Sequence, residues 1–225
     1  MKAYTDKYTK QGRISRILIN GYFHAVQKLI THIDPIHSAL EIGCGEGFST
    51  ARLRQLLPAG THFSASEYEA SQIEPAQKRN PGISIIQEDL FQTQREANSV
   101  DLVFLLEVLE HLSEPTVALQ ILKKISARYL ILGVPNEPLW RILNFSRGKY
   151  WQDWGNTPGH INHFSSHALV ALIEKEFGPV IHVCRPIPWT IVLAEKRSVI
   201  AHPAVPHIQH AIDVHQKKKS MQIGS

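Results

Sequence analysis

The stretch from Ala39 to Gly47 constrains the fold more than any other part of the chain. An apolar run ends in an acidic residue, and glycines at positions 43, 45 and 47 then lead into an amphipathic segment. Because glycine has no side chain, such a turn can bend sharply and bring its backbone close to a ligand. The pattern therefore predicts a strand, a tight turn and a helix, with a nucleotide-type pocket at the turn.

Two common nucleotide-binding motifs do not fit this turn. The dinucleotide fingerprint needs its third glycine five residues after the first, where this chain has Phe48. The phosphate loop needs Gly-Lys followed by Ser or Thr, and no such sequence follows this turn. An NAD-dependent oxidoreductase is thus the weakest interpretation, and an ordinary strand-to-helix turn stays open as an alternative.

Short β-rich runs alternate with helical patterns along most of the chain. This alternation implies right-handed βαβ units and a mainly parallel sheet covered on both faces. The last two runs are joined only by residues 185–189, too short for a helical crossover, so they should pair antiparallel. The expected fold class is α/β, a Rossmann-like three-layer sandwich whose seven-stranded, mainly parallel sheet has an antiparallel last strand. The expected strands are 39–42, 61–65, 84–87, 100–106, 129–133, 180–184 and 190–194, and the expected helices are 15–32, 49–57, 69–79, 115–126 and 165–177.

Composition points to one soluble domain. The chain has 225 residues, of which 43% are hydrophobic and 20% charged, and its net charge of +4 does not by itself call for a nucleic-acid partner. Cys44 and Cys184 lack metal-ligand or CxxC spacing, so we expect free thiols. No secretion signal or membrane span is recognisable, which predicts a cytoplasmic protein.

The glycine turn resembles the first motif of the class I S-adenosylmethionine-dependent methyltransferases, in particular the small-molecule, ubiquinone-biosynthesis-like type. S-adenosylmethionine carries a carboxylate, an ammonium, a ribose and an adenine but no phosphate, so a glycine turn without a phosphate-binding cation suits it. The resemblance also implies a reversed final strand. It implies cofactor contacts at Glu41, Gly43, Cys44, Gly45 and Gly47.

Three further regions extend the resemblance. Glu67 closes the second predicted strand, where an acid can accept both ribose hydroxyls. In the family, an acid after the third strand binds the adenine amino group and the next backbone amide contacts the ring, which here implies Asp89 and Leu90. Residues 101–112 resemble the fourth motif, and Glu107 would face the methionine end of the cofactor. A solvent-facing loop for Glu67 and a turn-forming role for Asp89 remain alternatives.

Residues 134–164 form an insertion between the fifth strand and the following helix, and a connection this long is usually functional. Its end, Gly159 to Ser165, resembles a Gly-His-x-x-x-Phe-Ser stretch of the small-molecule subgroup. Methyl transfer from a sulfonium is an in-line displacement, and a hydroxyl nucleophile must also lose a proton. His160 and His163 are the candidate bases, although either could instead cap the next helix or hydrogen-bond the insertion to the core.

The leading hypothesis is methyl transfer to a hydroxyl of a small or lipophilic metabolite. Apolar and aromatic residues of the insertion could admit such an acceptor or touch a membrane surface as a peripheral contact. Alternatives are a catalytically inert S-adenosylmethionine-binding module and, less favoured, an RNA methyltransferase, because the motifs of nucleic-acid methylators are missing. We expect no metal site and no nucleic-acid partner.

The expected domain organisation has one main unit. A methyltransferase domain covers residues 1–195, with an N-terminal lid helix in 1–35 and the acceptor-side insertion at 134–164. Residues 196–225 are expected to form a flexible basic tail.

Overall fold

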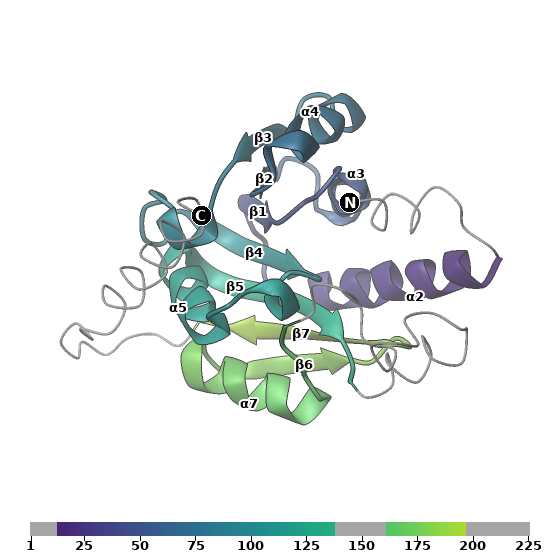
Figure 1. The fold of residues 1–225 in the computed structure, drawn as a ribbon, viewed down its shortest axis with the longest axis vertical. Helices are drawn as coiled ribbons and strands as arrows, with labels where there is room; N and C mark the ends of the chain where they lie inside the picture. Colours follow the sequence, from purple (N-terminus) through teal and green to yellow (C-terminus); the bar gives the residue numbers. More distant parts are fainter. Residues whose placement is uncertain (1–12, 138–160, 197–225) are drawn as a thin grey trace, which may run out of the picture.

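The computed structural model describes residues 13–137 and 161–196 of the chain. Within them one seven-stranded sheet has the order β3-β2-β1-β4-β5-β7-β6 (Figure 1). Adjacent strands from β3 to β5 pair in parallel, whereas β7 pairs antiparallel with both β5 and β6. The predicted α/β fold with a reversed last strand is therefore confirmed. The strands are β1 Ser38–Ile42, β2 His62–Glu67, β3 Ser84–Gln87, β4 Val100–Leu106, β5 Ser126–Pro135, β6 Val180–Cys184 and β7 Trp189–Glu195.

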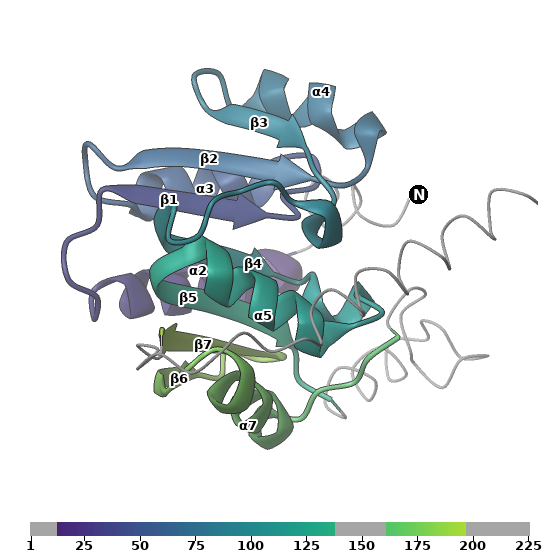
Figure 2. The ribbon, with the colours of Figure 1, turned by 90° about the vertical axis from the view of Figure 1, so that its left-hand side faces the viewer.

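Helices cover both faces of the sheet and complete the three layers (Figure 2). One face carries α2, α3 and α4, and the other carries α5 and α7. Two short 3-10 helices, η1 and η2, follow β3 and β4. The helices are α2 Arg13–Ile30, α3 Phe48–Leu56, α4 Ala70–Arg79, α5 Pro115–Ile125 and α7 Ser166–Glu176, with η1 Leu90–Gln92 and η2 Leu109–His111.

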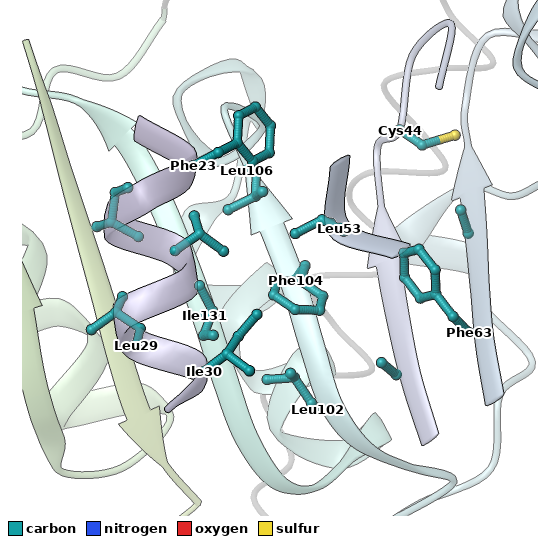
Figure 3. Close-up of a cluster of buried hydrophobic side chains, with 14 of the residues drawn as sticks. Phe23, Leu29, Ile30, Cys44, Leu53, Phe63, Leu102, Phe104, Leu106 and Ile131 are labelled. Carbon is teal, nitrogen blue, oxygen red and sulfur yellow. The ribbon is translucent and has the colours of Figure 1, made fainter. Parts of the chain in front are cut away.

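The central strand β4 supplies side chains to two separate hydrophobic cores. Leu102 and Phe104 point to the face covered by α2 and α3 (Figure 3), and Val103 and Leu105 point to the face covered by α5 and α7. Side chains alternate along a strand, so a strand buried on both faces reads as one apolar run. This is why residues 100–106 were recognisable as a strand.

Two other expectations concern the described residues. Cys44 and Cys184 are both free cysteines. Among the described helices, none combines the length and apolar composition that crossing a bilayer would need. Residues 138–160 of the insertion, residues 197–225 of the tail and residues 1–12 lie outside the described part of the chain, so the expected lid, insertion and tail stay predictions.

Candidate functional site

The three glycines of the turn after β1 have different surroundings. All three adopt left-handed backbone, with φ of 78° at Gly43, 53° at Gly45 and 77° at Gly47. A Cβ at Gly43 would collide with Val108, and one at Gly47 with Asn80, whereas a Cβ at Gly45 would meet nothing within 4 Å. Gly43 and Gly47 therefore serve close packing, and Gly45 borders open space that a ligand can approach.

Hydrogen bonds tie this turn to the end of β2. The amides of Gly43 and Cys44 donate to the carbonyl of Ser66 at 2.8 and 3.1 Å. The Gly45 amide donates to Oε2 of Glu67 at 2.7 Å, and the Glu69 amide donates to Oε1 at 3.0 Å. The structure thus brings Glu67 beside the open side of the turn. Each carboxylate oxygen has a second lone pair, so Glu67 can still accept from ligand hydroxyls.

Glu41 supports the turn from inside the protein. Its side chain is only 1% exposed and accepts a 2.6 Å hydrogen bond from the Thr50 hydroxyl in α3. Burial raises the pKa of Glu41 to about 7; hydrogen bonds from Ser49 and Thr50 oppose this rise, and the charge of Glu67 adds to it. Glu41 therefore links β1 to the first turn of α3 and sits close enough to Glu67 to feel its charge.

Cys44 lies within the same turn, and its side chain is a protonated thiol. Burial, and then the charges of Glu41 and Glu67, raise the pKa of the Cys44 thiol well above its usual range. A thiol in this state is a poor nucleophile, because the thiolate is the reactive form. Cys44 therefore contributes its backbone to the turn, through its amide to Ser66 and its carbonyl to Gly47.

Asp89 and Leu90 lie at the neighbouring strand end. The Glu88 amide donates to the Glu67 carbonyl at 2.9 Å, which places the end of β3 beside the end of β2. Asp89 caps η1 by accepting from the Phe91 amide at 3.0 Å, and Leu90 is buried against the α5 side. The turn-forming alternative for Asp89 is thus a real structural role, and contact with adenine stays a prediction.

Glu107 follows β4 in an uncommon conformation. Its φ of 57° is left-handed for a residue with a side chain, and its amide donates to the carbonyl of Gly133 at 2.7 Å. Such strain costs about 1 to 3 kcal/mol and tends to occur at functional sites. The next residue, Val108, packs on Gly43, so the end of β4 and the glycine turn lie together.

Two residues at the end of α4, Arg79 and the C-cap Asn80, hold the turn in place, and sequence reasoning missed both. The Asn80 amide group is buried and donates to the carbonyls of Gly47 and Ala76, each at 2.9 Å. Arg79 donates to the Glu46 carbonyl and lies 3.6 Å from the centre of the Phe48 ring. No sequence motif marks these residues, because their partners in the glycine turn lie 33 positions away.

A second group of polar residues gathers where β4 and β5 end. The amides of Ile161 and Asn162 donate to the Glu110 carbonyl at 3.0 and 3.1 Å, and the Asn162 side chain donates to the Leu112 carbonyl at 2.6 Å. The segment that follows the insertion is therefore fixed against the exit of β4.

His163 belongs to this segment and faces Glu137, the last described residue after β5. Its Nδ1 lies 3.6 Å from Oε1 of Glu137, and the Glu137 amide donates to the Phe164 carbonyl at 3.0 Å. The side chain of His163 is 39% exposed and that of Glu137 only 9%. The structure thus pairs an accessible imidazole with a buried carboxylate. His160, the other candidate base, lies outside the described residues.

The cap of α7 also bears on His163. Ser165 caps this helix, because its hydroxyl accepts a hydrogen bond from the Ala168 amide at 3.2 Å. The alternative in which His163 caps the helix is therefore wrong. Glu137 was missed in the sequence because its partner lies across the insertion.

These residues suit an amino-acid-bearing nucleoside better than a diphosphate. Glu67, Asp89 and Glu107 lie at the carboxyl ends of β2, β3 and β4, on either side of the glycine turn that follows β1, and this edge of a largely parallel sheet is where open α/β folds bind ligands. Carboxylates accept hydroxyl and amino donors and attract a sulfonium or an ammonium, and they repel phosphates. The open side of Gly45 leaves room for the ligand backbone.

Comparison with known families gives one match. Residues 14–182 match the family described as "Methyltransferase domain", which is more than half of the chain. No curated protein matches the chain significantly.

Solved structures with the same fold are distant in sequence. A putative methyltransferase from Haloferax volcanii, in complex with a methyltransferase activator, has a TM-score of 0.65 at 11% identity, over 83% of this chain and 94% of that one. The magnesium protoporphyrin IX methyltransferase of Synechocystis PCC 6803, with bound SAH, has a TM-score of 0.62 at 17% identity, over 86% and 94%. A SAM-dependent methyltransferase of Aquifex aeolicus has a TM-score of 0.62 at 16% identity, over 78% and 89%.

Proposed function

The chain belongs to the methyltransferase-domain family and is an S-adenosylmethionine-dependent methyltransferase, and on this premise we propose that it methylates a hydroxyl oxygen of a small, lipophilic metabolite. S-adenosylmethionine supplies an electrophilic methyl group on a sulfonium. The protein has to hold that cofactor, place the acceptor oxygen in line with it, and remove the hydroxyl proton.

The cofactor position in this proposal follows the row of strand ends. Its body lies along the open side of Gly45, and Glu67 accepts the ribose hydroxyls. Asp89 and the Leu90 amide receive the adenine, and Glu107 faces the methionine ammonium. The backbones of Gly43, Cys44 and Gly47 shape the turn around it, and Glu41 acts from the interior by holding the start of α3.

The observation that carries the hydroxyl assignment is the His163–Glu137 pair. A hydroxyl is a poor nucleophile until a base takes its proton, and an imidazole is the usual base near neutral pH. Glu137 orients the ring and stabilises the imidazolium that forms, while the exposed face of His163 can meet an acceptor. A neutral amine would need no base before attack, so the pair favours an oxygen acceptor.

The composition of the segment 138–160 supports a lipophilic acceptor. The two residues that flank this segment, Glu137 and Ile161, both lie beside the end of β4. The sequence between them is rich in apolar and aromatic residues. These are Leu139, Trp140, Ile142, Leu143, Phe145, Tyr150, Trp151 and Trp154. One protein of the same fold is a magnesium protoporphyrin IX methyltransferase, so the fold can serve a small-molecule acceptor.

The test is methyl transfer from labelled S-adenosylmethionine to matched pairs of alkyl phenols and alkyl anilines. We expect the product on the phenol oxygen, and more of it as the alkyl chain lengthens. Methylation of the aniline alone, or of added RNA, would overturn the oxygen assignment. The product is identified by mass spectrometry.

Replacement of His163 by alanine tests the base. We expect kcat to fall by about 10²- to 10⁴-fold while affinity for S-adenosylhomocysteine stays unchanged. His167→Ala is the matched control, because His167 is an exposed histidine that, like His163, follows residues 138–160 in the sequence, but it lies in α7. A normal kcat in His163→Ala would show that the base lies elsewhere.

A further inference from the structure

The first turns of α2 project beyond the sheet. Tyr22 packs edge-on against Trp189, with ring centres 5.1 Å apart, and a Cβ at Gly133 would strike its hydroxyl. Trp189 pairs with Pro135 at the carboxyl end of β5, so Tyr22 already lies level with the sheet edge. Residues 13–21 then extend roughly 13 Å further at the usual helical rise. Figure 1 shows this end of α2 reaching past the tips of β4 and β5.

This projecting end carries two highly exposed isoleucines. Ile14 is 71% exposed and Ile17 69%, the highest values among the large apolar side chains that the structure describes. They are three residues apart, so they lie on the same side of the helix. Further along α2, Ile19, Tyr22 and Val26 are buried. The helix therefore buries one apolar face in the core and presents a second, small apolar group to the outside.

The two helices α2 and α3 at this part of the surface are cationic. Neither α2 nor α3 contains an Asp or a Glu, whereas together they carry five arginines and lysines. Arg52 of α3 donates to the Asn20 side chain at 3.1 Å and lies 5.8 Å from the Phe23 ring, which joins the two helices into one surface. The five cations are Arg13, Arg16, Lys28, Arg52 and Arg54.

We propose that the α2 rim, defined as Arg13, Ile14, Arg16, Ile17 and Arg52, docks this protein onto an anionic lipid membrane. Isoleucines on a cationic helix end match the boundary between lipid headgroups and acyl chains, where apolar side chains insert and cations meet the negative surface potential. A nucleic acid would engage the cations but would leave Ile14 and Ile17 in water. The apolar pair therefore favours a membrane over a nucleic acid.

This orientation turns the carboxyl edge of the sheet toward the bilayer. The rim lies beside the strand ends, so an acceptor dissolved in the membrane could reach the site without crossing water. The docking itself does not depend on methyl transfer, since vesicle binding is measured without cofactor or acceptor. Failure of the oxygen-methylation assignment and failure of docking are thus separate results.

Vesicle sedimentation of the full chain tests the proposal. We expect binding to phosphatidylcholine–phosphatidylglycerol vesicles and at least about tenfold weaker binding to phosphatidylcholine alone. Replacing both Arg13 and Arg16 by glutamine should weaken binding about 30-fold, on the basis of the usual contribution of each cation near an anionic surface. Replacing both Ile14 and Ile17 by asparagine should weaken it about tenfold while the charge is unchanged.

Matched controls lie on other surfaces. Lys123→Gln with Lys124→Gln removes two charges from α5 on the opposite face, and Ile86→Asn removes an exposed isoleucine from β3. Both should bind vesicles as the unaltered chain does. All rim variants should keep their melting temperature and their activity on a water-soluble acceptor, because the replaced side chains are exposed.

Equal binding to both kinds of vesicle, or unchanged binding of the isoleucine variant, would overturn the proposal. Binding of a short RNA without binding of vesicles would identify the surface as a nucleic-acid site instead.

Discussion

The two halves of the candidate site are built in different ways. The donor half, around Gly45 and Glu67, is made of consecutive strand ends joined mainly by backbone hydrogen bonds. The acceptor half joins Glu110, Glu137 and His163, which come from three separate parts of the chain, and its chemistry depends on one pair of side chains. A pocket for a shared cofactor can be built from local backbone geometry, whereas recognition of an acceptor relies on side chains that tertiary structure brings together.

The strongest test of this contrast fills the open space of the donor half. Gly45→Arg should abolish S-adenosylhomocysteine binding, because its side chain would project into the space beside the turn. The left-handed backbone makes any side chain cost about 1 to 2 kcal/mol of stability. Gly60→Arg is the matched control, since Gly60 has a φ of 87° and equally open surroundings but lies in the turn before β2. Calorimetric titration should show normal binding for the control; normal binding for both variants would place the donor elsewhere.

The next effect concerns the support beneath the donor half. The pKa of Glu41 is raised from 4.5 to about 7 in the folded protein, chiefly by burial. Between these values the unfolded chain loses its proton while the folded chain keeps it, so the free energy of unfolding falls as pH rises from about 4.5 to 7 and levels off above. This fall amounts to about 3 kcal/mol. Urea unfolding at several pH values should show it, and Glu41→Gln should remove it; identical pH profiles for the two proteins would refute the assignment.

A side-chain change in the acceptor half should affect turnover alone. Glu137→Gln keeps the size of the side chain but removes the charge that stabilises the His163 imidazolium, so we expect kcat to fall by about 10- to 100-fold. Affinity for S-adenosylhomocysteine should stay the same, because the donor half is untouched. A loss of cofactor affinity equal to the loss of kcat would show that the two halves are not separate.

The smallest expected effect comes from the carboxylate at the donor edge. Glu67→Ala removes the acceptor of the Gly45 amide and the proposed ribose contacts, and should weaken S-adenosylhomocysteine binding about tenfold. Glu69→Ala, which alters the exposed neighbour, is the control. Unchanged affinity in Glu67→Ala would leave this residue with a purely structural role in holding the turn.

Much of the donor half could be predicted from the sequence because its signals are local. Apolar runs and helical spacing located the elements, and the glycines at 43, 45 and 47 marked the turn. Sequence did not distinguish the three glycines, since their different surroundings depend on Val108 and Asn80, which other elements supply. It also did not reveal that Ser165, and not His163, caps α7.

The sequence by itself determined the order of strands and helices, the reversed last strand and the bend after β1, because periodicity, short connections and glycine conformations act over a few residues. Only the tertiary structure decided that Glu137 meets His163, that Asn80 and Arg79 brace the turn, and that the end of α2 extends past the sheet. These contacts join residues far apart in the chain, and their distances are set by strand order and core packing, which no short stretch of sequence contains.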